Sequence, residues 1–437
     1  MLYKQCLILI FASSIWTNNI PIVSSIEFKG HKITKDYIIE REIQHPLDIP
    51  LDSSLADQDK DRLLNLGIFA DVSWSMVPLA DLTVILQYSL IESSLRILPA
   101  ASPAYEEEYG WSFGGMLMIR NFRGKNENLT FAGSTGARKS FFLSFNNPWI
   151  MGDHVSLRMD AGQSNTNHPF LDYEQNTITS EIIVGRYFGY KHKASIGFEL
   201  EKKTFTGRID TLEYLSINPM GSYSYDTRDV YRDPSKGVLI TQGFFSILNL
   251  EKDKNNLWWV QSYSLYHTLN TSLKKLTAGF NFSFLTTFGD IHEVFVSWLG
   301  GAQNVRGWSI PTKSIYSNLD NKFRFGNHSA VFSAELRQTI IPTKVFKTQL
   351  MDWKQEYGLT VVGFFDVGYT SREKADLFND LPMIGTGIGF RIPFPMIGTV
   401  GIDYGWGYRD GSFIDQALHL AFGQKYAKGY WICKPGE

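Results

Sequence analysis

Apolar and polar residues alternate with a period of two over most of the chain beyond residue 110. In residues 155–161 (VSLRMDA) and 194–200 (ASIGFEL), every second position is apolar and the positions between are small, polar or charged. Successive side chains of a strand point to opposite faces, so each segment has one apolar and one polar face. Charges at alternate positions do not suit the interior of a soluble sandwich. They suit the water-facing inside of a barrel whose outside meets lipid.

Counting such segments predicts about sixteen strands, an even number as bacterial barrels have. The expected strands are residues 111–119, 127–136, 138–147, 152–162, 177–189, 193–203, 212–226, 237–250, 257–270, 275–288, 292–298, 329–341, 356–369, 383–392, 397–407 and 416–426. The longest connection runs from Leu299 to His328, between the expected strands eleven and twelve.

Residues 22–92 have the pattern of a compact α/β unit. The expected elements are a strand at Ile22–Phe28, a helix capped by Thr34, a helix from Leu55 to Leu66 that stops at Gly67, and strands at residues 70–76 and 82–87. Residues 93–109 contain two prolines and an acidic run, and we expect them to form a linker.

Residues 1–20 have the features of an export signal. Lys4 supplies a positive charge, and the short apolar run from Cys6 to Ile15 contains small residues near its end. The run is too short to span a bilayer. If this segment is removed, Cys433 is the remaining cysteine and no intramolecular disulfide can form.

Composition narrows the class of protein further. The formal net charge of the 437 residues is −2, so no basic excess is available to neutralise nucleic-acid phosphates. The mean hydropathy of −0.15 argues against a polytopic helical membrane protein. A lipid-facing β-barrel is compatible with this mean hydropathy because only alternate residues of its strands need be apolar.

The most informative segment is residues 300–308 (GGAQNVRGW), in which Arg306 stands among apolar residues. An arginine is unfavourable to bury unless a carboxylate meets it. In residues 333–337 and 364–368, the alternation places Glu335 and Asp366 on the face opposite to the apolar residues. The pattern therefore predicts that Arg306 folds into the lumen toward these acids. The alternative is a surface turn with a solvated arginine.

Several motifs together resemble the BamA-type superfamily of outer-membrane β-barrels with periplasmic POTRA domains. They are the tetrapeptide Val305-Arg306-Gly307-Trp308 with the acids Glu335 and Asp366, residues 225–229 (YDTRD) with Pro234 and Gly237, Asn147-Pro148-Trp149, and residues 63–69 (LLNLGIF). The resemblance covers nearly the whole chain. It implies an all-β transmembrane barrel of about sixteen antiparallel strands preceded by one small α/β POTRA domain. The expected parts are a signal peptide (1–20), a POTRA domain (22–92), a linker (93–109), the barrel (110–426) and a tail (427–437).

The resemblance also implies location, function and partners. It places the barrel in the outer membrane and the POTRA domain in the periplasm. The implied function is the assembly or insertion of other outer-membrane proteins, with unfolded clients, the lipid bilayer and accessory lipoproteins as partners. The alternative is a translocation pore that exports a dedicated secreted polypeptide, for which two POTRA domains and a plugging helix would be expected. No catalytic or metal-ligand motif is evident, so we expect neither an enzyme nor a cofactor or metal.

A lateral seam is expected between the first and last strands, residues 111–119 and 416–426. Gly114, Gly115 and Gly423 would weaken pairing there, since strand glycines contribute no side-chain packing. The last strand resembles the terminal signal of outer-membrane barrels, with Leu420, Phe422 and a closing aromatic residue, Tyr426. The chain departs from that pattern by continuing past Tyr426. The alternative is that these glycines serve only the shear of the sheet.

Overall fold

The computed structural model describes residues 20–81, 83–92, 96–106, 110–152, 154–189, 191–229, 234–251, 255–270, 272, 274–347, 354–394 and 398–422. They form two compact units. One contains the residues up to Arg96 together with Arg120–Glu127, and the other contains Ile97–Ile119 and the residues from Asn128 onward. The expected signal peptide up to residue 19, the expected tail at residues 427–437, and Gly423 and Tyr426 lie outside the described residues.

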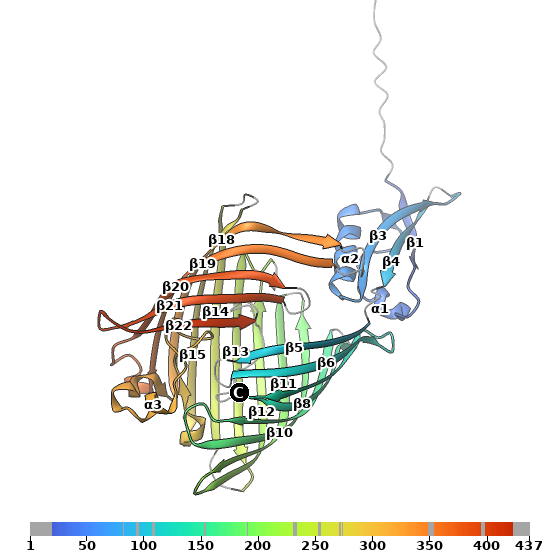
Figure 1. Ribbon diagram of the computed structural model, residues 1–437. Coiled ribbons are helices and arrows are strands. Elements are labelled where there is room, and N and C mark those ends of the chain that lie inside the picture. The colour runs from blue at the N-terminus through green and yellow to red at the C-terminus, as the bar shows by residue number, and fades with distance from the viewer. Residues whose placement is uncertain are drawn as a thin grey trace, which may run out of the picture. The chain divides into compact units, whose positions relative to one another are not determined.

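The first unit is a small α/β domain (Figure 1). Its elements are β1 (Ile22–Lys29), α1 (Asp36–Glu40), β2 (Ile49–Pro50), α2 (Ser53–Asn65), β3 (Phe69–Pro78) and β4 (Thr83–Glu92). The sheet order is β2-β1-β4-β3, with β1 parallel to β4. Ile38 and Ile39 of α1 and Leu63 of α2 are buried in one core with Leu86 and Tyr88 of β4. The helices therefore pack on the sheet through their apolar residues.

The caps of the two helices differ from each other. Asp52 caps α2, because its carboxylate accepts the backbone N–H groups of Ser54 and Leu55 at 2.9 and 3.1 Å. The expected cap at Thr34 is wrong, since α1 begins at Asp36 after an extended residue that makes no side-chain cap. The backbone N–H and the hydroxyl of Thr34 instead donate to the Glu92 carboxylate at 2.7 and 2.6 Å.

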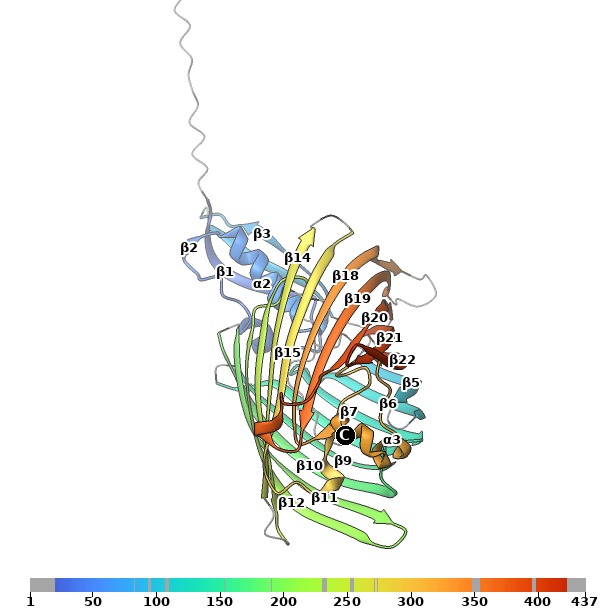
Figure 2. The ribbon, with the colours of Figure 1, turned by 90° about the vertical axis from the view of Figure 1, so that its left-hand side faces the viewer.

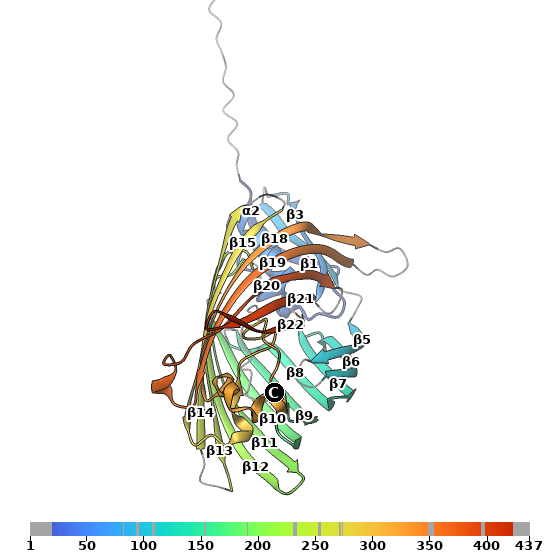
Figure 3. The same ribbon diagram turned by 60° about the vertical axis from the view of Figure 1, so that its left-hand side comes forward.

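The second unit is one antiparallel sheet of 16 strands. Its strands are β5 (Ile97–Glu106), β6 (Gly110–Phe122), β7 (Glu127–Gly136), β8 (Lys139–Met151), β9 (Val155–Asn167), β10 (Tyr173–Phe188), β11 (His192–Gly207), β12 (Thr211–Asp226), β13 (Gly237–Asn249), β14 (Asn255–Asn270), β15 (Leu276–Gly289), β18 (His328–Lys347), β19 (Lys354–Ser371), β20 (Met383–Phe394), β21 (Gly398–Arg409) and β22 (Ser412–Phe422). Each strand neighbours the next along the chain, with β15 beside β18. The sheet curves round so that its two end strands, β5 and β22, come near each other (Figure 2, Figure 3).

The segment expected to be a linker is largely a barrel strand. Strand β5 has 10 residues and pairs antiparallel with β6, from Ile97 opposite Ile119 to Glu106 opposite Gly110. The linker prediction is therefore wrong for these residues. It rested on Pro99, Pro103 and the acidic run at residues 106–108, but proline is tolerated in an edge strand, and β5 is one end of the sheet.

The strand expected at residues 292–298 is not part of the large sheet. This segment contains a single 3-10 turn, η1 (Glu293–Phe295), and the short strand β16 (Ser297–Trp298), which pairs with β17 (Phe325–Gly326). Val294, Phe295 and Val296 are all buried, so the segment lacks the alternation of a spanning strand. The predicted count of strands agrees with the sheet because β5 replaces this segment.

The expected facing of the barrel strands is confirmed. Leu336 and Phe365 are 48% and 43% exposed on the outside, whereas Glu335 and Asp366 are 4% and 0% exposed. The apolar face is thus outward and the acidic face inward. Among the described residues, no helix is long and apolar enough to span a membrane.

A disulfide scan can test the placement of β5. Ala101 lies opposite Gly115 in the register, and facing Cβ atoms lie about 5 Å apart, within disulfide range. We expect Ala101→Cys with Gly115→Cys to oxidise in a Cys433→Ser background, as seen by electrophoretic mobility without reductant. The control pairs Ala101→Cys with Gly133→Cys on β7, two strands away at about 10 Å, and should stay reduced. Failure of the first pair to oxidise would return residues 97–106 to a linker.

Candidate functional site

The site is the connection between β15 and β18, here called the arginine loop, which lies between the eleventh and twelfth strands of the sheet as expected. It includes α3 (Lys313–Ser317) and η2 (Leu319–Arg324), and β16 and β17 pair near its two ends. Within it, the Gly301 N–H donates to the Trp308 carbonyl at 2.7 Å. The Asn304 side chain accepts the N–H groups of Gly300 and Val305 at 2.6 and 2.7 Å. Residues 300–308 therefore form a closed turn that fixes the direction of Arg306.

Arg306 is fully buried, with 0% of its surface exposed, and its guanidinium contacts acids on three strands. Its Nε and Nη2 donate to the two oxygens of Asp366 on β19 at 2.8 and 2.9 Å, a bidentate arrangement. Its Nη1 donates to Glu335 on β18 at 2.5 Å and to Asp403 on β21 at 3.5 Å. Its Cζ lies 3.9 Å from the centre of the Phe364 ring, which adds a cation–π contact. The surface-turn alternative for Arg306 is excluded.

Two further arginines complete a charge cluster in the lumen. Arg337 contacts Glu335 at 2.7 Å, and Arg391 of β20 donates to both oxygens of Asp403 at 2.5 and 2.9 Å. With Arg306, the cluster contains three guanidinium groups and three carboxylates, so its formal charges balance. Such balance is necessary because an uncompensated charge in this buried place would cost several kcal/mol.

Glycines on the inner face of β20 and β21 allow the loop backbone to lie directly on the strands. A Cβ atom at Gly385 would overlap the carbonyl oxygen of Arg306, and a Cβ at Gly405 would lie 2.8 Å from the Cα of Gly307. Gly307 itself has φ +88°, and a Cβ there would lie 2.6 Å from the carbonyl oxygen of Trp406. Arg306 therefore reaches its acids because neither the loop nor the wall carries a side chain at this contact.

Trp308 anchors the next part of the arginine loop. It is 1% exposed and packs with Leu299, Val305, Val331 and Met383. Its indole N–H donates to the Ile384 carbonyl of β20 at 2.9 Å. The tetrapeptide of the sequence motif thus makes one continuous contact with the inner wall from β18 to β21.

The outer part of the arginine loop contacts the turn between β9 and β10. Phe170 of that turn is 1% exposed and packs against Trp298, Tyr316 and Phe325 at centroid distances of 4.8 to 5.3 Å. Beside it, Lys313 forms an ion pair with Asp172. The loop is therefore held on two sides, through charge on β18 to β21 and through aromatic packing at the β9–β10 turn.

Burial sets the charge of two groups around the arginine loop. It lowers the pKa of His168 to about 4, with a further lowering by Lys203 against the opposing effect of the Val294 carbonyl, so His168 is neutral at neutral pH. Burial also lowers the pKa of Arg324 to about 10, although Asp415 opposes this, so Arg324 keeps its charge. Within the described part of the chain, no group of three or more His, Cys, Asp or Glu residues is arranged to hold a metal.

Comparisons with known proteins agree with this geometry. The model of the Omp85 superfamily domain matches residues 121–426, and that of the POTRA family, described as a surface antigen variable number repeat, matches residues 21–92. The chain belongs to the Omp85 superfamily. Its barrel accordingly lies in the outer membrane and its POTRA domain in the periplasm.

Individual relatives of this Omp85 superfamily protein are distant in sequence. The outer membrane protein assembly factor BamA of Nitratidesulfovibrio vulgaris is 23% identical over 420 residues, which are 92% of this chain and 51% of that protein. The chain thus spans about half the length of that relative. Two solved structures share the fold: BamA from Haemophilus ducreyi lacking POTRA domains 1–3 (TM-score 0.61, 16% identity, 92% of this chain and 85% of that one) and CdiB from Acinetobacter baumannii (TM-score 0.56, 12% identity, 92% and 73%).

The expected seam of the Omp85 barrel is displaced by one strand. Gly114 and Gly115 lie on β6, which has β5 and β7 as neighbours, so they are inside the sheet and not at its end. The prediction that they border the seam is wrong, because β5 precedes them. Leu420 and Phe422 do lie on the end strand β22, opposite Ile402 and Val400 of β21.

Sequence reasoning missed several residues of the Omp85 lumen. Arg391 and Asp403 belong to the charge cluster, and His419 of β22 accepts the Gly307 N–H at 3.0 Å. One signal was present in the sequence, since Gly385, Gly387 and Gly389 recur at every second position. A strand face made of glycine marks a place where another backbone approaches closely.

Removing the loop arginine should destabilise the barrel strongly. We expect Arg306→Ala to lower the free energy of unfolding by about 3–5 kcal/mol, because buried carboxylates lose their partner. Arg306→Lys keeps the charge but not the bidentate contact with Asp366, so its free energy of unfolding should lie between those of Arg306→Ala and the unmodified protein. The measurement is urea unfolding of the folded barrel in detergent. Arg208→Ala, at an exposed arginine in the β11–β12 turn, is the control. Equal, small losses for Arg306→Ala and Arg208→Ala would contradict the role of the cluster.

A methyl group on the glycine face should have a similar but smaller effect. We expect Gly385→Ala to destabilise the barrel by about 1–3 kcal/mol, because the added carbon overlaps the Arg306 carbonyl. At Gly363 of β19, a Cβ atom would meet nothing within 4 Å, so Gly363→Ala should change stability by no more than about 0.5 kcal/mol. The same unfolding measurement compares the two. If both variants match the unmodified protein, the loop does not lie on the glycine face.

Proposed function

We propose that this Omp85 protein inserts other outer-membrane proteins, and that client strands pair at the seam between β5 and β22. The observation that carries the proposal is the sheet order, whose two ends are β5 and β22. An end strand presents backbone N–H and C=O groups to which another strand can add. The curated relative named as an assembly factor and the common fold support the same function.

The backbone of β5 supports a seam that opens readily. The Arg120 N–H donates to the Arg96 carbonyl at 2.7 Å, which makes this facing pair a hydrogen-bonded one. Hydrogen-bonded and non-hydrogen-bonded pairs alternate along an antiparallel ladder. Continuing the register along β5, Pro99 and Pro103 fall on non-hydrogen-bonded pairs and direct their backbone away from β6. Proline has no N–H, so the free edge of β5 lacks donors at both positions.

The POTRA domain offers a second edge to an unfolded client. Strand β3 is one end of the POTRA sheet, and its residues Asp71, Ser73 and Ser75 are exposed. An extended client segment can add to this edge through backbone hydrogen bonds. In this proposal, the POTRA edge receives the client, the seam templates its strands, and the arginine loop braces the lumen. Accessory lipoproteins would act on the POTRA side.

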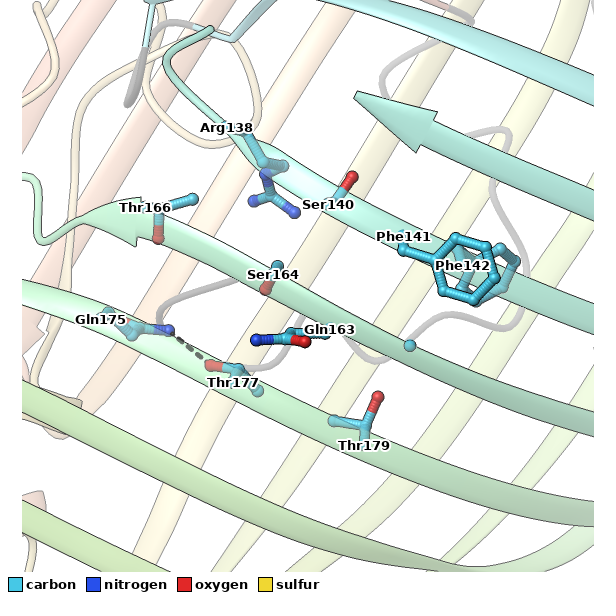
Figure 4. A pocket seen from close by; sticks show the side chains of 11 residues that line it. Arg138, Ser140, Phe141, Phe142, Gln163, Ser164, Thr166, Gln175, Thr177 and Thr179 are labelled. Carbon is cyan, nitrogen blue, oxygen red and sulfur yellow. Dashed lines mark hydrogen bonds between the residues drawn. The ribbon is translucent and has the colours of Figure 1, made fainter. Parts of the chain in front are cut away.

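A second candidate function is the export of a dedicated polypeptide through the lumen. The inner wall of β8 to β10 holds a cavity of about 320 Å³ lined mainly by hydroxyl and amide groups (Figure 4). The cavity residues are Arg138, Ser140, Phe141, Phe142, Gly162, Gln163, Ser164, Thr166, Gln175, Thr177 and Thr179. A neighbouring cavity of about 440 Å³ shares Phe142 and contains Arg158 and Lys193. The acids Glu335, Asp366 and Asp403 that bind Arg306 lie on a different part of the wall, β18 to β21. The hydroxyl and amide groups of the cavity can face a polar polypeptide, and this lining is the observation that favours export as the alternative.

A disulfide across the seam distinguishes the two functions. Cysteine pairs scanned between residues 97–106 and 412–422 in a Cys433→Ser background should include one that oxidises. Locked protein in liposomes should fail to insert client barrels, measured by their heat-dependent gel mobility, and should recover on reduction. The Ala101→Cys and Gly115→Cys pair, which joins β5 to β6 and leaves the seam free, is the control. Full insertion by a completely oxidised seam variant would contradict the pairing of client strands at the seam. Absence of insertion even by the reduced protein would favour export through the lumen.

A further inference from the structure

The arginine loop makes a second set of contacts that does not involve the charge cluster. All of them reach β22, the end strand at the seam. The Gly307 N–H donates to Nε2 of His419 at 3.0 Å. The backbone N–H and the hydroxyl of Ser309 donate to Asp415 at 3.0 and 2.7 Å, and Arg324 lies 3.9 Å from the same carboxylate.

These contacts matter because of the place of β22 in the sheet. His419 is 1% exposed, and Asp415 is four residues away, so both residues lie on the inner face. As an end strand, β22 has one neighbour in the sheet order, β21. The arginine loop is therefore a second support for β22, acting from inside the barrel.

The arginine loop is itself fixed to strands remote from the seam. Arg306 binds Asp366 on β19 and Glu335 on β18, and Gly307 is the next residue. A displacement of β22 away from the lumen must either break the contacts of His419 and Asp415 or pull the loop from its buried charge partners. Breaking the contacts to β22 is the easier of the two, because Arg306 donates five hydrogen bonds to the acids of the charge cluster whereas the loop donates three to His419 and Asp415, and the cluster has less access to water.

We infer that His419 and Asp415 are positioning residues through which the arginine loop holds β22 in the wall and sets how readily the seam opens. The inference rests on the proposed function, because pairing of client strands at the seam requires β22 to separate from β5. In this contact, Nε2 of His419 is the acceptor and the Gly307 N–H is the donor.

Hydrogen–deuterium exchange of the full chain in lipid, without any client, tests the inference. His419→Leu removes the acceptor, and we expect peptides from β22 to exchange about 5- to 30-fold faster, as the loss of a buried hydrogen bond predicts. His419→Gln places an amide oxygen within reach of the same N–H and should restore near-normal exchange. Ser309→Ala removes one donor from the loop side and should accelerate β22 about fivefold, with every strand residue unchanged.

Two controls separate this effect from a general loss of stability. Peptides from β14, on the far part of the sheet, should exchange at the same rate in all variants. Leu418→Ala changes the outer face of β22, where Leu418 is 62% exposed, and should leave the exchange of β22 unchanged. Unchanged β22 exchange in both His419→Leu and Ser309→Ala would overturn the inference, as would equal acceleration of β14 and β22. If the exchange of β22 responds as expected but the unmodified protein does not insert client barrels into liposomes, the proposed function is wrong and the inference about β22 stands.

Discussion

The burial of one guanidinium group, that of Arg306, is the constraint on which the lumen depends. A charged group removed from water needs opposite charges and hydrogen bonds from the protein. Glu335, Asp366 and Asp403 supply them from three different strands. The arginine loop must therefore reach the depth of these acids. The inner face of β20 and β21 must also lack side chains there, which explains the glycines at alternate positions.

The parts of this arrangement that sequence reasoning found are those with a local signal. Period-2 alternation assigns each strand residue to a face without knowledge of its neighbours, so it placed Glu335 and Asp366 inside and Leu336 and Phe365 outside. The alternation also places Asp403 and His419 on the inner face, but it does not show which inner residues meet the loop. Their part in the site depends on which strands lie beneath the loop, a property of the curved sheet that no single segment encodes.

The errors at the boundaries have a common physical origin. Pro99 and Pro103 suggested a linker because proline cannot donate to a ladder, yet an end strand needs donors on one side only. Val294, Phe295 and Val296 suggested a spanning strand, yet all three are buried in the arginine loop. Composition alone could not distinguish a lipid-facing strand from a packed loop. The loop nevertheless remained between strands eleven and twelve, because one missed strand offset one false strand.

The two sides of the seam are unequal in a way that bears on how it could open. On one side, the free edge of β5 lacks backbone donors at Pro99 and Pro103, so it offers two hydrogen bonds fewer to a partner strand than an edge without proline. On the other side, β22 is held from within the lumen by His419 and Asp415. In the proposed function, weak pairing across the seam lowers the free energy of separating β5 from β22, while the contacts of His419 and Asp415 oppose the displacement of β22. In that proposal, a client strand reaches the free backbone edge of β22 only after these contacts break, so the contacts set how often the edge is available for pairing.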